Sequence, residues 1–474
     1  MHVVPISNIL AERYASQEMT DLFDPHNRVR TERQWWLAVL SAQRDLGLEV
    51  AAESIPAYEA VIDQIDLESI QERERETRHD VKARLDEFCA LAGFEDLHKG
   101  LTSRDATENV EQLLTWQALK LIEGRTAALL NRYAELAAEY ATTVIVGRTH
   151  NVAAQPTTVG KRFAQQGEEL LAAYENVVDL RARFAIRGVK GPVGSQQDQI
   201  DLLGGPEQAA ELEDRLSEYL GVPRVLDAVG QVYPRSLDFE VVAALLQLGS
   251  APANSALQIR LMAGHDLATE GFRPGQVGSS AMPHKMNTRS CERIGGLFSI
   301  IRGHLTMAAN LAGDQWNEGD VSCSVVRRVV LPDSFLALDG LYETAFAVLN
   351  DFGVYPGVIS AEVKRYLPFM ATPTLLMHAV RNGMGREVAH ELIKEHAVAT
   401  ALDMREGNAD GSAIVSRLAA DDRYPGDIAT LTELVDNPEA LLGAIDKQVA
   451  AVCGRIRRVA DQRPESMYRG ADIL

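Results

Sequence analysis

The chain has 474 residues, of which 46% are hydrophobic and 24% charged, and its 47 lysines and arginines against 67 aspartates and glutamates give a net charge of −20. This length suggests roughly three domains, and the hydrophobic content is ordinary for a protein with a large core. A strongly negative field repels nucleic acid and anionic membranes, so neither is an expected partner. An anionic substrate must therefore be held by local arginines and backbone donors.

The cysteines and the first residues indicate the compartment. Cys89, Cys291, Cys323 and Cys453 are far apart, and no CxxC spacing or cluster with histidine predicts a zinc site. Scattered single cysteines fit a reducing compartment. The first residues lack a basic segment followed by an apolar stretch, so no signal peptide is expected. These features predict a cytoplasmic protein.

The chain divides into three predicted helical parts. The first, residues 1–108, ends near the polar stretch GLTSRDATEN. The second, residues 109–361, carries the longest helical patterns, and the third, residues 362–474, follows the turn GVYPGVIS. No stretch alternates convincingly with a period of two, so little sheet is expected. We therefore expect an all-α fold of three helical domains.

Long helices are predicted in the second part. After Asn109, apolar residues recur at spacings of three, four and seven, and a second such run follows Pro156, a residue suited to a helix start. Each run extends for about thirty residues, against a typical helix of about a dozen. The apolar segment Glu240–Gly264 contains Arg260 and amide side chains that would be costly in lipid. It is expected to be a buried helix of a long bundle.

A loop of about twenty residues, GFRPGQVGSSAMPHKMNTRS, interrupts this pattern, and such a long loop in a compact domain is usually functional or disordered. We call residues 271–290 the signature loop. A surface linker is the plain alternative, but lysine and asparagine at fixed offsets from paired serines serve no linker purpose. Its segment Gly278–Asn287 resembles the G-S-S-x-M-P-x-K-x-N signature of the fumarase/aspartase superfamily, with every fixed position present.

The elimination chemistry that this resemblance implies explains the residue types. Releasing an amine from a succinyl group requires removal of a proton beside a carboxylate, which then gains negative charge. Lys285 and Asn287 would stabilise that charge, and Ser279, the first serine of the pair, would be the base. Its alkoxide needs N–H dipoles or Lys285 in a site without water, so we expect the loop to close over the substrate. Glu292, just after the loop, is a further catalytic candidate.

The acid for the leaving amine is predicted from a second segment. Val146–Thr158 resembles the superfamily's G-R-T-H-x-Q-x-A-x-P-T-T, which makes His150 the proton donor. The alternative is a loop histidine without a role in the reaction. The glutamine that follows the histidine in the pattern is displaced here, so its substrate contact is not carried over. His150 is expected just before a helix start.

A third segment, Thr102–Asn109, resembles the superfamily's T-S-x-D-x-x-[DE]-[NT] stretch. The resemblance implies that Thr102 and Ser103 hold a substrate carboxylate through hydroxyl and amide donors. The same residues also suit a helix N-cap followed by acidic first-turn residues. Both roles are compatible.

Other segments resemble one branch of the superfamily, the adenylosuccinate lyases. Arg78–Ala83 matches R-H-D-V-x-A, in which His79 supports the acid or contacts the substrate while Arg78 and Asp80 line the nucleotide site. A charged helix face is the alternative interpretation of this triplet. His284 also points to this branch, because fumarases carry glycine there.

The start of the chain carries a further match, R-Y-x-S-x-E-M, in which Arg13 would meet a phosphate and Tyr14 would pack near the ribose or base. The segment GQVYPRSLDFE resembles T-Q-x-x-x-R-D, with Gly230 and Ser236 as departures. The remaining substrate-binding candidates that the resemblance supplies are His98, Gln231, Arg235, Ser324 and Arg328.

The main departure lies in residues 316–328, WNEGDVSCSVVRR, where the common pattern is W-x-E-R-D-x-S-x-S-S-x-E-R. Gly319 replaces an arginine, Cys323 a histidine and Arg327 a glutamate, while Ser324 and Arg328 remain as candidate phosphate contacts. Losing one arginine should weaken phosphate binding unless another, such as Arg327, compensates. We interpret the departure as a variant of the lineage rather than a lost function.

In the last part, Gly383–Glu391 resembles the family's G-x-x-R-x-x-A-H-E helix. The spacing of His390 and His396 places them on different helix faces, and the H-E-x-x-H pattern is absent, so a structural role is expected rather than a metal site.

The resemblance implies a homotetramer with a twenty-helix core and active sites built from three subunits, with no metal or organic cofactor. The implied reactions are cleavage of adenylosuccinate to AMP and fumarate, and of the succinylated aminoimidazole carboxamide ribotide (SAICAR) to AICAR and fumarate. The alternatives are another fumarate-releasing lyase, such as argininosuccinate lyase, and a non-catalytic structural protein. Retention of Ser279, Lys285, Asn287 and His150 together argues against the second.

Overall fold

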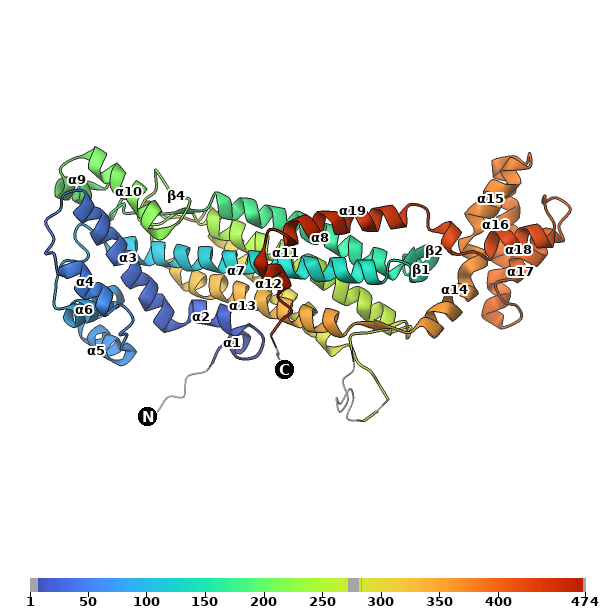
Figure 1. Cartoon of the computed structure of the whole chain (residues 1–474), viewed down its shortest axis with the longest axis horizontal. Helices are drawn as coiled ribbons and strands as arrows, with labels where there is room; N and C mark the ends of the chain where they lie inside the picture. Colours follow the sequence, from blue (N-terminus) through green and yellow to red (C-terminus); the bar gives the residue numbers. More distant parts are fainter. Residues whose placement is uncertain (1–6, 272–280, 283, 472–474) are drawn as a thin grey trace.

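Long helices form the centre of the molecule, which a computed structural model describes for residues 7–271, 281–282 and 284–471. The five longest helices in this described part lie side by side along the length of the molecule (Figure 1). α7 packs against α8, α11 against α12, and α12 against α13. These helices are α7 (Ser103–Glu139), α8 (Val159–Ala182), α11 (Ser236–Ala263), α12 (Arg289–Leu311) and α13 (Ser322–Asp351).

Local capping explains where the first of these helices begins. Thr102 is the N-cap of α7, and Asp105 returns the bond in a capping box, so the helix starts six residues before the predicted position after Asn109. The N-cap interpretation of this segment is therefore confirmed. The apolar residues that recur every three or four positions then bury α7 in the main hydrophobic core.

The second predicted helix start is wrong. Pro156 lies in β2 (Val152–Thr158), where it pairs with Val146 of β1 (Val144–Thr149), and α8 begins only at Val159. Two causes explain the shift. Proline is tolerated in an edge strand as well as at a helix start, and the Thr158 hydroxyl oxygen accepts from the Lys161 N–H at 3.0 Å and so caps α8 one turn later.

Strands are few and short, as the sequence predicts. The β1–β2 hairpin is antiparallel with a register shift between Val146 and Arg148. Two further sheets in the described residues are two-residue pairs that join segments distant in the chain: β3 (Ala185–Ile186) with β4 (Arg224–Val225), and β5 (Ala268–Thr269) with β6 (Gly353–Val354). The all-α class is confirmed.

Shorter helices gather at the end of the bundle where α7 begins (Figure 1). α3 packs against α7, and α10, far along the chain, packs against α3. α2 contacts both α7 and α13 along the side of the bundle. These helices are α1 (Ile9–Arg13), α2 (Gln17–Phe23), α3 (Pro25–Asp45), α4 (Ser54–Ala60), α5 (Leu67–Thr77), α6 (Asp80–Ala92), α9 (Gln197–Leu203) and α10 (Pro206–Leu220).

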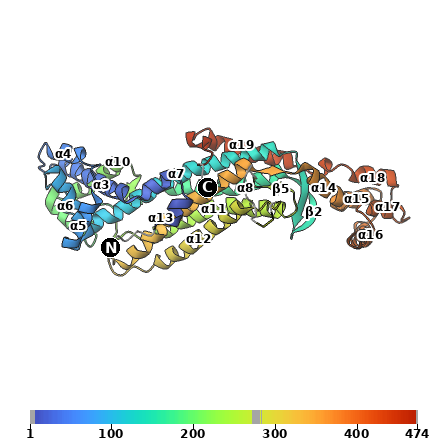
Figure 2. The same ribbon diagram turned by 90° about the horizontal axis from the view of Figure 1, so that it is seen from below.

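At the opposite end, α14 (Pro356–Met370) packs on the β1–β2 hairpin and leads into a group with its own hydrophobic core. The chain then returns to the bundle, where α19 packs against α7 and α8. Both end groups project beyond the bundle in the turned view of Figure 2. The helices after α14 are α15 (Thr372–Arg381), α16 (Arg386–Glu406), α17 (Ala413–Ala419), α18 (Ile428–Val435), η1 (Glu439–Leu441), α19 (Ile445–Ala460) and η2 (Pro464–Met467).

The apolar segment Glu240–Gly264 is the greater part of α11 and lies within the bundle, as predicted. Across the described ranges, no helix combines the length and apolar character that a membrane crossing requires. The division of the chain at residues 108 and 361 stays a proposal, because α14 crosses the second boundary and packs on β1 and β2, and α19 and η2 of the third part pack on α7.

Candidate active site

The start of α7 is a rigid, buried corner. Asp105 accepts from the Thr102 backbone N–H at 2.7 Å and from the Lys190 and Gly191 N–H groups at 2.9 and 3.1 Å. The same carboxylate forms an ion pair with Arg187, and neither side chain is exposed. A buried charge is stable only when it is paired and hydrogen-bonded, as Asp105 is. This network fixes the backbone of Thr102 and Ser103, the predicted carboxylate cradle.

His98 lies just before this corner and has a defined protonation state. Its Nδ1 accepts a hydrogen bond from the Trp36 Nε1–H at 3.2 Å. Burial lowers the pKa of His98, although the nearby carboxylate of Asp105 opposes the shift. The accepting Nδ1 and the lowered pKa both indicate a neutral imidazole with its hydrogen on Nε2.

Arg78, His79 and Asp80 form the junction between α5 and α6. Arg78 has a positive φ of 51° at the end of α5, and the His79 Nδ1 accepts from the Lys82 N–H at 3.3 Å as the N-cap of α6. Burial opposes ionisation of Asp80, but Arg84 at 3.3 Å and Arg328 at 3.9 Å keep its pKa below the ordinary value. Arg78 and His79 are exposed and Asp80 is half-buried, which fits both the functional interpretation and the alternative of a charged helix face.

The long helix α13 brings two further candidates to this end. Arg328 reaches Asp80, and Ser324, one turn earlier, accepts a hydrogen bond from Arg104 Nη1 at 3.0 Å. Arg104 stands at the variable position of the T-S-x-D pattern and is not among the residues predicted from the sequence. The sequence feature that points to Arg104 is the glycine at position 319, where the family pattern has an arginine.

Arg327 does not compensate for that exchange, contrary to the sequence expectation. Its guanidinium is buried and contacts the carboxylates of Asp238 and Glu111, each at 2.7 Å, and of Glu108 at 3.3 Å. Arg235 is also buried, with Nη2 2.6 Å from Glu108. Both arginines are engaged by carboxylates inside the protein and are not positioned at its surface.

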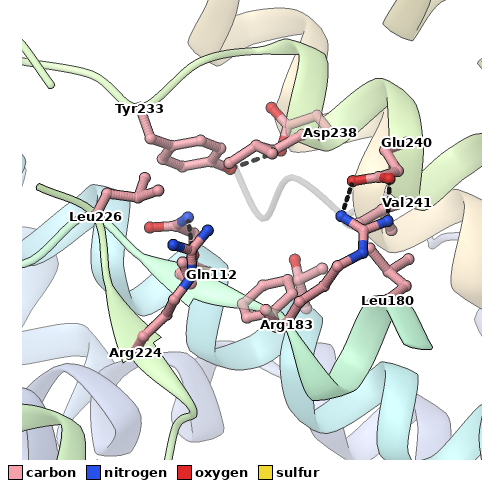
Figure 3. A pocket seen from close by; sticks show the side chains of 13 residues that line it. Gln112, Leu180, Arg183, Arg224, Leu226, Tyr233, Asp238, Glu240 and Val241 are labelled. Carbon is pink, nitrogen blue, oxygen red and sulfur yellow. Dashed lines mark hydrogen bonds and ion pairs between the residues drawn. The ribbon is translucent and has the colours of Figure 1, made fainter. Parts of the chain in front are cut away.

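A small cavity lies behind this buried network (Figure 3). Tyr233 and Asp238 line one side of it, Gln112 of α7 lines another, and Arg183 bonds Glu240 at its edge. None of the site residues predicted from the sequence lines this cavity. Gln231, two residues before Tyr233, is half-buried, and its backbone N–H donates to the Glu318 carbonyl at 2.8 Å.

His150 lies at the opposite end of the bundle, and its expected position before a helix is wrong. It occupies the exposed turn between β1 and β2 with a positive φ of 52°. Arg148 fixes the hairpin by an ion pair with Glu362 of α14. The histidine is therefore exposed on a supported hairpin, with room for a partner on its open side.

The described part of the signature loop lines an open cleft at this same end of the bundle. His284, Lys285 and Asn287 face it together with Glu292 of the first turn of α12. The carboxylate of Glu270 accepts from the first N–H groups of α12 and so fixes the start of that helix. Ser279, the predicted base, lies outside the described residues.

Tyr14, which follows Arg13 at the end of α1, lies beside the start of α12. The Arg293 guanidinium is 5.7 Å from the centre of the Tyr14 ring. Tyr14 packs on Gly340 of α13, where an added Cβ would be 2.7 Å from the tyrosine Cβ. This contact requires glycine and fixes the tyrosine on the bundle.

One chain therefore holds its candidate residues in two groups. The first group lies at the start of α7, and His150 follows the end of that helix (Figure 1). A straight helix of this length spans about 55 Å at its usual rise per residue. No single substrate of nucleotide size reaches both groups in one protomer.

The fold is shared with solved lyase-like structures. The structure of 3-carboxy-cis,cis-muconate lactonizing enzyme from Pseudomonas putida aligns with a TM-score of 0.81, 19% identity, and coverage of 96% of this chain and 100% of that one. A fumarate lyase from Mesorhizobium sp. BNC1 aligns with a TM-score of 0.79, 19% identity, and coverage of 95% and 100%. The family model described as "Lyase" matches residues 15–303. The fold and the signature loop thus define a lyase of the fumarase/aspartase superfamily.

The remaining comparisons narrow this class. Residues 368–452 match the family model described as "Adenylosuccinate lyase C-terminus". The chain is 33% identical to the adenylosuccinate lyase of Saccharomyces cerevisiae, over 93% of this chain and 92% of that protein. It is 34% identical to that of Schizosaccharomyces pombe, over 82% of each. The chain belongs to the adenylosuccinate lyase family and is a carbon–nitrogen lyase.

Proposed function

We propose that the chain cleaves adenylosuccinate into AMP and fumarate, and SAICAR into AICAR and fumarate, by β-elimination at one site. The observation that carries this proposal is the match along nearly the whole chain to proteins named adenylosuccinate lyase, including a family-specific C-terminal segment. The full-length match does not favour argininosuccinate lyase, the alternative weighed from the sequence.

The proposed reaction begins with removal of a proton from the carbon beside a substrate carboxylate by the Ser279 alkoxide. The carboxylate then carries added negative charge, which the Lys285 ammonium and the Asn287 amide stabilise. Support for these roles comes from the open cleft that Lys285 and Asn287 both line. Glu292, at the rim of the cleft, orients the substrate or the loop.

His150 donates a proton to the departing nitrogen, and the C–N bond electrons leave with the purine amine. An exposed imidazole on a fixed hairpin suits this role because it can enter a site formed by another chain. His79, which caps α6 and lies beside Asp80, supports the acid or contacts the substrate.

The binding groups lie mainly at the start of α7. Thr102 and Ser103 hold a carboxylate of the succinyl group, and His98 supports that corner. Arg78 and Asp80 line the nucleotide site. The remaining proposed contacts are Gln231 toward the substrate, Arg13 and Tyr14 toward the nucleotide, and Ser324 and Arg328 toward the phosphate, whereas the buried Arg235 is withdrawn as a contact.

We infer that the active form is a homotetramer in which three chains contribute to each site. The separation of about 55 Å along α7 supports this, because one protomer cannot place both groups on one substrate. Exposed apolar side chains on two helices of the bundle also support it, since packing against further copies of the chain would remove them from water. They include Leu257 and Leu261 of α11 and Val325 and Val329 of α13.

The small-molecule substrates are the only partners proposed besides further copies of the chain. A cytoplasmic location is proposed on the free thiols: Cys89, Cys291, Cys323 and Cys453 carry no disulfide, and three of them are buried.

The test is to incubate the purified chain with adenylosuccinate, SAICAR and argininosuccinate and to follow fumarate release. Fumarate from the two purine substrates, at a rate within the usual enzymatic range of about 1–1000 per second, is the expected result. Release from argininosuccinate alone would replace the proposal with the alternative lyase. A chain that releases fumarate from none of them would not be an active lyase of this group.

A further inference from the structure

Position 319 cannot carry the arginine of the family pattern. Gly319 has a φ of +150°, a conformation that side-chain-bearing residues rarely adopt. A Cβ there would be 3.1 Å from both methyl carbons of Val232 and 3.3 Å from the Gln231 Cβ. The backbone here suits glycine, and the guanidinium that the pattern places at this position is missing.

Arg104 reaches this segment from the first turn of α7. Its Nη2 donates to the Asp320 carbonyl at 3.3 Å, and its Nη1 donates to the Ser324 Oγ at 3.0 Å. The arginine thus bridges the residue that follows Gly319 and a candidate phosphate ligand. In the family pattern its own position, between the T-S pair and the aspartate, carries no fixed residue.

The charge of Arg104 is not cancelled by its acidic partner. Glu108 is 3.1 Å from Arg104, but the same carboxylate also pairs with Arg235 at 2.6 Å and Arg327 at 3.3 Å. Three guanidinium groups therefore share one buried carboxylate. The Arg104 side chain is 13% exposed, whereas that of Arg327 is 1% exposed, so Arg104 is the member of this set that reaches the surface.

The surrounding groups complete a site for a phosphate monoester. Ser324 accepts from Arg104, so its own hydroxyl hydrogen can be donated to an anion. Arg328 lies one turn further along α13 and is 59% exposed. Asp320 is the nearby acid, but its carboxylate accepts from the Ser322 N–H at 2.7 Å and the Ser322 hydroxyl at 2.6 Å, which ties it to the start of α13.

We propose that Arg104 supplies the substrate's 5′-phosphate with the cation that the family pattern takes from position 319. This rests on the proposed function, because the phosphate belongs to the succinylated nucleotide. Arg104 and Arg328 contact the phosphate oxygens from two helices, and Ser324 donates between them. A planar guanidinium can bond two of these oxygens at once.

The experiment compares adenylosuccinate with its nucleoside form, which lacks the phosphate, in the wild-type chain and in Arg104→Ala and Arg104→Gln variants. Loss of a charge-assisted hydrogen bond should raise KM for the nucleotide about tenfold or more, with a smaller change in kcat. The kcat/KM for the nucleoside should stay near its wild-type value. Inorganic phosphate should inhibit the wild-type chain more strongly than either variant.

The two substitutions separate charge from structure. Glutamine keeps a donor for Ser324 without the charge, so both variants should lose nucleotide affinity if the cation contacts phosphate. Arg215→Ala, on α10 and away from the site, is the matched control and should leave both substrates unchanged. An equal loss on nucleotide and nucleoside would overturn the assignment and make Arg104 a structural residue. An inactive wild-type chain would instead refute the proposed function.

Discussion

The two ends of the central bundle are built in opposite ways. At the start of α7, charged side chains are buried and paired, as in Asp105 with Arg187 and Glu108 with Arg235. At the other end, His150 stands exposed on a hairpin turn, and Lys285 lines an open cleft. The proposed binding residues at the start of α7 stand on a fixed, buried network, whereas His150, the proposed acid, faces outward.

This difference has a physical reason. A binding group gains affinity when its position is fixed before the substrate arrives, because no ordering entropy is then lost on binding. A proton-transfer group that serves another protomer's site must instead be exposed in its own chain.

The strongest test of this contrast is His150→Gln. Removing a general acid lowers kcat by about a hundredfold to ten-thousandfold. Because the His150 side chain is exposed, the unfolding midpoint should stay near the wild-type value. Steady-state fumarate release and a thermal melt measure the two effects. Turnover that survives almost unchanged would mean that the acid has been misassigned.

Mixing variants extends this test to the shared site. His79→Gln, an exchange at the N-cap of α6, should also be slow on its own. If each site draws the two histidines from different chains, mixed oligomers of the two variants should contain some sites with both histidines intact. Activity should then rise on mixing. A mixture no more active than its components would contradict sharing.

The sequence predicted the class of fold because helix periodicity is a local pattern, whereas the candidate site residues stay predictions that rest on motif resemblance. The 3.6-residue periodicity of α7 and the capping signal at Thr102 each depend on residues that are close together in the sequence. The failures depend on contacts between distant segments. Arg327 looked like a free cation until the fold placed Asp238 and Glu111 around it. Pro156 was interpreted as a helix start because the helical periodicity of the residues after it carries no information about Val146, its partner in the neighbouring strand.

Asp105→Asn tests the contribution of the buried Asp105–Arg187 ion pair to stability. The amide keeps the shape of the side chain but leaves the Arg187 guanidinium buried without a counter-charge, which costs about 3–5 kcal/mol. Denaturant unfolding at a fixed protein concentration measures the loss, since an oligomer's stability depends on concentration. Asp63→Asn is the matched control, because the Arg30–Asp63 pair is exposed and worth about 1 kcal/mol or less. Equal losses of unfolding free energy in the two variants would show that burial does not increase the contribution of the Asp105 pair to stability.

The smallest effect is a dependence of stability on pH at the buried end. Burial lowers the pKa of His98 below its ordinary value of 6.5, so in acid the unfolded chain takes up a proton before the folded one does. Stability from this residue is therefore fully present above pH 6.5 and is lost as the pH falls through the folded pKa. Protonation would also place a hydrogen on Nδ1 and break the bond from Trp36.

His98→Gln removes this titration while keeping a polar group beside Trp36. Unfolding midpoints measured from neutral pH down to mildly acidic pH should fall more steeply for the wild-type chain than for the variant. Other buried groups titrate in both proteins and cancel in the difference. Parallel curves would show that His98 binds its proton equally well in the folded and unfolded chains, and the rigidity ascribed to the buried end would then not extend to this imidazole.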